Sequence, residues 1–219
     1  MFREHYRSAH EPHVPALTDA VARILGASDN VTGIDSFDIC DWLRERDRQL
    51  NLEVEASHPL GYMAPWLPSV FPDARFVITL RDPTSWIKSR LNYHYYKTPP
   101  EWQRYRELIW GRWHKGYHPE ESKLEELGLY SLDAYLRQYD EQYRLLFSHL
   151  PEDRRIVIPT ESLDLSGNRI AEFLQINPTS LRSRRDNAFP CEESIIDLLP
   201  PDFVAWRIEE TCGWVRSYL

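Results

Sequence analysis

An arginine, an aspartate and a serine follow one apolar run of the sequence. The run is RFVITL at 75–80, and after it come Arg81, Asp82 and Pro83, with Ser89 about two helical turns further on. Asp and Pro are typical N-cap and first residues of helices. An arginine fork and the free N–H groups of a helix start both suit phosphate oxygens. The pattern predicts an anion site; alternatively, Arg81 pairs with a neighbouring carboxylate and Ser89 is an ordinary helix residue.

The elements around this pattern predict an α/β protein. RFVITL has the composition of a parallel strand buried on both faces, and a helix should run from Pro83 to about Tyr96. Apolar positions at helical spacing predict the longest helix over 129–150, and a second good strand follows at 155–159. We also expect helices at 15–25, 41–48, 168–174 and near 202–214, and strands at 31–37 and 51–56. Strands that alternate with helices favour a parallel sheet covered by helices on both faces.

The segment FPDARFVITLRDPTSWIKSRLNYHY resembles the 3′-phosphate-binding segment of sulfotransferases that use 3′-phosphoadenosine 5′-phosphosulfate. The later RIVIPTESL, followed by a helix that ends in Phe173-Leu174, is similar to the second half of that family. The resemblance runs from about residue 8 to 190. It implies a three-layer, phosphate-loop-type fold with helices flanking a parallel sheet, as one domain over 1–219. It further implies that Arg81 and Ser89 bind the 3′-phosphate, and that the acceptor is a hydroxyl of a carbohydrate or small molecule.

The sequence departs from that family at its start. Family members open with a strand and a Gly-rich or Ser/Thr-rich loop that holds the 5′-phosphosulfate, and the eight glycines here form no such motif. We therefore expect the first strand and phosphate loop to be missing. The chain is then either a truncated form of a longer enzyme or a degenerate, non-catalytic homologue that acts as a binding or scaffold protein. A phosphate-loop kinase would need a GxxxxGK[ST] segment, which the sequence lacks.

The resemblance also implies an acceptor-side base and a basic loop. The turn AHEPH, which we expect to follow a short helix-like stretch, carries Glu11 where related enzymes place a base, with His10 and His13 as alternatives. Such a base takes the proton of the attacking hydroxyl; otherwise Glu11 is a capping or surface carboxylate. Arg184 and Arg185 match a loop that closes over the nucleotide, or else form a solvated basic patch.

Four of the aromatic residues in 102–117 could either pack in the core or line a cleft in which their rings stack on a sugar. They are Trp102, Trp110, Trp113 and Tyr117. In the predicted strand at 51–56, Glu53 and Glu55 point to the same side. This pattern favours a solvated face, and the alternative is a pair of catalytic carboxylates.

Composition sets the remaining expectations. A net charge of −8 argues against general nucleic-acid binding, and no apolar stretch approaches the length of a membrane span. Three cysteines without CxxC spacing (Cys40, Cys191, Cys212) indicate neither a disulfide framework nor a metal cluster, so no metal is expected. The N-terminus lacks the apolar core of a secretory signal, and we expect a cytoplasmic protein. The oligomeric state cannot be read from this sequence.

Overall fold

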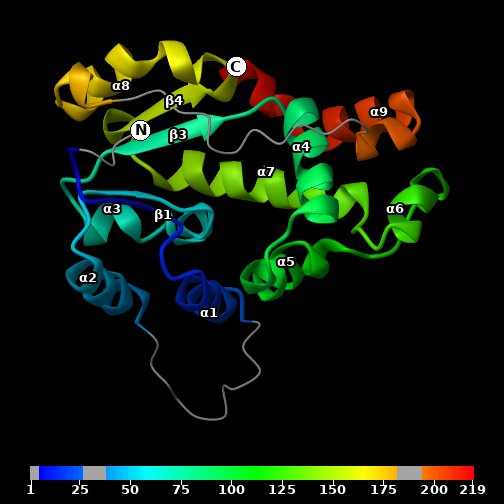
Figure 1. The fold of residues 1–219 in the computed structure, drawn as a ribbon, viewed down its shortest axis with the longest axis horizontal. Helices are drawn as coiled ribbons and strands as arrows, with labels where there is room; N and C mark the ends of the chain where they lie inside the picture. The colour runs from blue at the N-terminus through cyan, green and yellow to red at the C-terminus, as the bar shows by residue number, and fades with distance from the viewer. Residues whose placement is uncertain (1–4, 27–37, 182–193) are drawn as a thin grey trace. The chain divides into compact units, whose positions relative to one another are not determined.

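The computed structural model describes residues 5–26, 38–181 and 194–219, which are mostly helical (Figure 1). The helices are α1 (Val14–Ile24), α2 (Ile39–Leu50), α3 (Leu67–Val70), α4 (Pro83–Tyr96), α5 (Gln103–Ile109), α6 (Ser122–Glu126), α7 (Leu132–His149), α8 (Gly167–Leu174) and α9 (Pro201–Cys212). The strands are β1 (Ser8–His10), β2 (Val54–Ala56), β3 (Phe76–Leu80) and β4 (Arg155–Pro159). A 3-10 segment, Thr160–Leu165, directly follows β4.

Two compact units share these elements. Unit 1 comprises Met1–Ile78, Arg144–Ile158 and Ser162–Arg184, and unit 2 comprises Thr79–Tyr143, Pro159–Glu161 and Arg185–Leu219. The division passes through β3, β4 and α7, so each of these elements contributes to both units. A single domain over 1–219 stays a prediction.

In unit 1, β1 and β2 form a short parallel pair. The paired residues are Ser8 with Val54, Ala9 with Glu55, and His10 with Ala56. We expected a helix-like stretch before residue 11, and that expectation was wrong because the backbone of 8–10 pairs with β2. The predicted strand at 51–56 also shortens, since Asn51 ends α2 in the left-handed conformation (φ 47°).

The second sheet consists of β3 and β4, which lie side by side (Figure 1). The Thr160 hydroxyl, just after β4, donates to the Leu80 carbonyl at the end of β3 (3.2 Å), so both strands end at the same edge and run parallel. We expected β3 to be buried on both faces. Instead Ile78 and Leu80 are buried while Val77 and Thr79 are exposed, because only alternate side chains of the strand face the core.

The architecture is therefore mainly helical with small parallel sheets, which agrees with an α/β sulfotransferase-type fold. In the described part of the chain the strands form two separate pairs instead of the wider sheet that we expected. A three-layer arrangement stays a prediction, and the predicted strand at 31–37 lies outside the described residues.

Aromatic side chains fill much of the core of unit 2. Tyr105, Trp110 and Tyr135 are each at most 2% exposed. His94 of α4 lies edge-on to Trp110 (4.5 Å between centroids), and its Nδ1 is 3.0 Å from the Tyr135 hydroxyl. Such edge-to-face pairs add about 0.5–1.5 kcal/mol beyond burial. The structure thus confirms a core role for Trp110, whereas Trp102, Trp113 and Tyr117 are half-buried.

The helices agree well with the pattern of apolar residues. The strongest predicted helix, 129–150, is found as α7, and the helices predicted at 15–25, 41–48 and 168–174 are found as α1, α2 and α8. Among the described residues, no helix combines the length and apolarity that crossing a bilayer requires. Cys40 is half-buried, Cys212 is buried with its Sγ 3.5 Å from the Leu136 carbonyl oxygen, and Cys191 lies outside the described residues.

Candidate functional site

Arg81 lies directly after β3 in unit 2, and its guanidinium has one hydrogen bond to a described residue. Its Nε donates to the Ser85 hydroxyl at 3.2 Å. Within residues 5–26, 38–181 and 194–219, no carboxylate lies within ion-pair distance of Arg81, and no hydrogen bond uses its terminal nitrogens. The alternative in which a neighbouring carboxylate neutralises Arg81 is therefore not observed in the described structure. The two Nη groups remain available to an anion.

Three hydroxyl groups fix the backbone that carries Arg81. Successive carbonyls at the end of β3 each accept one side-chain hydrogen bond from α7 or from the segment after β4. The pairs are Tyr143 to Thr79 (2.9 Å), Thr160 to Leu80 (3.2 Å) and Tyr139 to Arg81 (2.6 Å). A carbonyl that ends a strand has no ladder partner, and these hydroxyls supply one. The position of the Arg81 Cα is thus set by tertiary contacts on both sides of the strand end.

Burial makes these tyrosines poor acids. Desolvation raises the pKa of Tyr143 to about 12 and raises the pKa of Tyr139 still further. The charge of Glu161 raises the pKa of both phenols, while Arg90 and Arg81 lower the pKa of Tyr143 without cancelling the effect of burial. Both hydroxyls consequently remain protonated donors throughout the physiological pH range.

Asp82 caps α4 with its own carboxylate. Its Oδ1 accepts the N–H groups of Thr84 (2.9 Å) and Ser85 (3.1 Å), and its carbonyl accepts the N–H of Trp86 (2.8 Å). Pro83 has no N–H. The predicted N-cap and first helical residue are confirmed, but the expectation of free N–H groups for an anion was wrong, because Asp82 occupies them. Anion binding at this strand end has to come from side chains.

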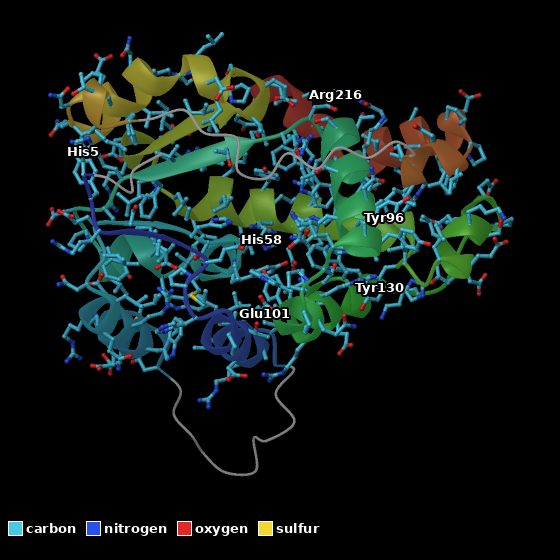
Figure 2. The ribbon with its side chains drawn as sticks, viewed as in Figure 1. His5, His58, Tyr96, Glu101, Tyr130 and Arg216 are labelled. Carbon is cyan, nitrogen blue, oxygen red and sulfur yellow. The ribbon has the colours of Figure 1, made fainter. Side chains whose placement is uncertain are left out.

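Ser85 and Ser89 lie one helical turn apart on α4, and Ser85 is the nearer to Arg81. Residues four apart share a helix face. Ser89 is exposed, whereas Ser85 is half-buried and its Oγ lies 3.3 Å from Glu161 Oε1 and 3.1 Å from the Asp82 carbonyl. Tyr96, labelled in Figure 2, marks the far end of the same helix. Arg81, Ser85 and Ser89 therefore form one polar strip at the start of α4.

Glu11, His10 and His13 lie in unit 1, in the turn between β1 and α1. Glu11 (φ 50°) and His13 (φ 58°) both adopt the left-handed conformation, which non-glycine residues rarely adopt. The Glu11 N–H donates to the Ala56 carbonyl (2.9 Å), and His10 Nδ1 lies 3.1 Å from the same oxygen. His10 Nε2 is 3.5 Å from Glu11 Oε2. The carboxylate thus sits in a turn and not on a helix face, as predicted.

A largely buried ion pair, Arg46 with Glu55, supports this turn. Arg46 of α2 binds Glu55 of β2 through both terminal nitrogens (2.5 and 2.7 Å) and also donates to the Pro12 carbonyl (3.2 Å). Ser57 donates to Glu55 as well (2.6 Å). Glu55 is therefore a structural carboxylate in this unit, while Glu53 accepts the backbone N–H of Arg7 (2.9 Å) near the surface. Strained turns persist where surrounding contacts over-determine them.

The predicted site residues fall into three groups. Arg81 and Ser89 both belong to unit 2, and Glu11, His10 and His13 all belong to unit 1. Arg184 and Arg185 lie outside the described residues. Among the described residues, no cluster of three or more His, Cys, Asp or Glu side chains could hold a metal ion.

Sequence reasoning missed Ser85, Glu161 and the hydroxyl groups that bind the end of β3. Tyr139 and Tyr143 lie in the helix predicted over 129–150, and each carries a hydroxyl that needs a partner when buried. Their spacing of four residues, which places them on one helix face, was the available signal. Glu161 belonged to the Thr-Glu-x-Leu segment, but nothing in the sequence connected it with Ser85.

Comparison with known proteins identifies the family. A family model described as the sulfotransferase domain matches residues 48–191, a span that includes the strand, the arginine and helix α4 of the site in unit 2. The match covers more than half of the chain, and the chain belongs to the sulfotransferase domain family. Membership of this family supports a transferase class, with sulfuryl transfer as the general reaction of the family. No curated protein matches the chain.

Proposed function

We propose that the protein transfers a sulfuryl group from 3′-phosphoadenosine 5′-phosphosulfate to a hydroxyl of a carbohydrate or small-molecule acceptor. Family membership supports the reaction class. The observation that carries the choice of donor is the guanidinium of Arg81, whose terminal nitrogens have no partner among the described residues. Two parallel N–H donors match two oxygens of a phosphate.

The strip at the start of α4 fits the 3′-phosphate of this donor. Arg81 would supply charge and a fork, and the exposed hydroxyl of Ser89 would supply one further donor from the same side of the helix. Because Asp82 occupies the helix N–H groups, the arginine is the main source of affinity. Arg184 and Arg185 would close over the nucleotide, as the family resemblance implies.

On the acceptor side, Glu11 takes the proton. The donor supplies the sulfuryl group: the acceptor oxygen bonds to sulfur as the bond from sulfur to the 5′-phosphate oxygen breaks, and adenosine 3′,5′-bisphosphate leaves. The acceptor hydroxyl loses its proton to a carboxylate or imidazole in the same step. Glu11 is our choice because it lies in a turn with a left-handed backbone, at the position where the family resemblance places a base, and His10 and His13 remain the alternatives. A cytoplasmic location stays a prediction.

Calorimetry with adenosine 3′,5′-bisphosphate tests the donor site. Arg81→Ala should weaken binding by about 10- to 100-fold, since a hydrogen bond to a charged group contributes about 1.5–3 kcal/mol. Arg104→Ala, which removes an exposed arginine of α5 in the same unit, is the matched control and should bind like the parent. If the Arg81 and Arg104 variants bind equally well, the assignment of the 3′-phosphate to Arg81 is wrong.

A further inference from the structure

The orientation of the Arg81 guanidinium depends on Ser85. A guanidinium can bind a phosphate in two ways, either through its two terminal nitrogens or through its Nε and one terminal nitrogen. In this structure Nε already donates to Ser85 Oγ at 3.2 Å, so the side edge is occupied. Only the end with Nη1 and Nη2 is left for an anion. Ser85 therefore selects one of the two binding modes that the arginine could use.

Ser85 is in turn held by a residue distant in sequence. Its Oγ is 3.1 Å from the Asp82 carbonyl, a contact that many helical serines make, and 3.3 Å from Glu161 Oε1, 76 residues along the chain. A serine hydroxyl has one proton and two lone pairs. It can accept from Arg81 while it donates to one of these two oxygens. The carboxylate is the stronger acceptor, because a hydrogen bond to an ionised group is charge-assisted.

The negative charge of Glu161 also bears on its role beside Arg81. A carboxylate near a phosphate site repels the ligand, so Glu161 opposes binding through its charge alone. It is also not within ion-pair distance of Arg81, and so it does not neutralise the arginine directly. A role in ordering Arg81 through the Ser85 hydroxyl gives the carboxylate a reason to lie there.

We propose that Ser85 and Glu161 are positioning residues, which fix the guanidinium of Arg81 so that its two terminal nitrogens face the 3′-phosphate of the nucleotide. This inference rests on the proposed function. It adds to the donor site two residues, Ser85 and Glu161, that do not themselves contact the phosphate. A purely structural role for the same contacts would lower stability without changing which nucleotide is preferred.

The test uses the ratio of two affinities measured on the full chain. Adenosine 3′,5′-bisphosphate and adenosine 5′-monophosphate differ by the 3′-phosphate, so the ratio of their dissociation constants isolates that group. Ser85→Ala should reduce the preference for the bisphosphate by about three- to tenfold, the effect of one hydrogen bond. Ser85→Thr restores the hydroxyl and should restore the preference. Thr84→Ala, an exposed hydroxyl of the same helical turn, should leave it unchanged.

A double-mutant cycle then tests Glu161. Glu161→Ala should reduce the preference in the parent and have no further effect in the Ser85→Ala chain, because it acts through that hydroxyl. An unchanged or increased preference in Glu161→Ala, an equal loss in both backgrounds, or a parental preference in Ser85→Ala overturns the inference. A parent chain without any preference for the 3′-phosphate would instead contradict the proposed function.

Discussion

At the scale of single residues, Arg81 and Glu11 are held in contrasting ways. Arg81 has an ordinary backbone whose carbonyl is fixed by Tyr139, and its side chain is oriented by one serine. Glu11 has a strained backbone, and contacts with Ala56 and, through Pro12, with Arg46 keep that strain in place. Backbone strain costs about 1–3 kcal/mol per residue, and it is commonly found where a side chain must be aimed. We interpret both arrangements as preorganisation.

The role of Glu11 can be tested by turnover. Glu11→Gln should lower kcat for sulfuryl transfer by about 100-fold or more, because loss of a general base typically costs about 10²–10⁴ in rate. The measurement follows transfer of labelled sulfuryl from the donor, with His10→Ala and His13→Ala assayed beside it. A kcat within about threefold of the parent for Glu11→Gln shows that it is not the base. If a histidine variant loses turnover instead, the role passes to that histidine.

At the scale of elements, the start of α4 depends on the Asp82 cap. Asp82→Ala leaves two N–H groups without their partner and should lower the free energy of unfolding by about 1 kcal/mol. Asp82→Asn keeps an acceptor oxygen and should retain most of the stability. Urea denaturation measures both.

The matched control for the cap is Asp202→Ala. Asp202 lies in the first turn of α9, where no side chain caps the helix. Its removal should change the free energy of unfolding by only a few tenths of a kcal/mol, through the helix dipole. Equal losses for Asp82→Ala and Asp202→Ala would show that the hydrogen bonds of the cap contribute nothing.

The β3–α4 element could be predicted from sequence because its signals are local. An apolar, β-branched run followed by Asp82 and Pro83 defines a strand and a helix start without reference to any other segment. An aspartate N-cap also implies that the first N–H groups of the helix are occupied, since the carboxylate of the aspartate is itself the anion that binds them. The pattern therefore indicated the element correctly, whereas the free helix N–H groups that it also predicted are occupied by Asp82.

The rest of the site depends on residues far apart in the chain. Ser85 contacts Glu161, and Tyr139 contacts the Arg81 carbonyl, because α4, the first part of α7 and the residues just after β4 all belong to unit 2. The spacing of apolar residues indicates which face of a helix is buried. It does not indicate which carbonyl a tyrosine hydroxyl on that face will bind. The turn at Glu11 was predicted as a turn, while β1 before it was missed because three residues carry no strand periodicity.

At the scale of the whole molecule, the buried tyrosines set a limit to alkaline stability. The pKa of Tyr143 rises from 10.0 to about 12 on burial, and those of Tyr135 and Tyr139 rise as well. The folded state therefore favours the neutral phenol. The stability that this provides is fully present below pH 10, and it is lost as the pH rises toward about 12.

We accordingly expect the free energy of unfolding to fall as the pH increases above 10. Urea denaturation across this range, with tyrosinate absorbance recorded in parallel, measures both the loss of stability and its cause. Tyr143→Phe cannot ionise at that position and should show a shallower decline. A parent whose stability is constant from pH 10 to 12, or a Phe variant with the same slope, would contradict this assignment.

The central claim is that Arg81 receives the 3′-phosphate of the donor nucleotide, and a crystal structure with bound adenosine 3′,5′-bisphosphate tests it most directly. We expect the 3′-phosphate to lie within hydrogen-bond distance of both terminal nitrogens of Arg81 and of the Ser89 hydroxyl. We also expect the Arg81 Nε to keep its hydrogen bond to Ser85, which the structure already has. A nucleotide bound with its 3′-phosphate away from Arg81 would contradict the account.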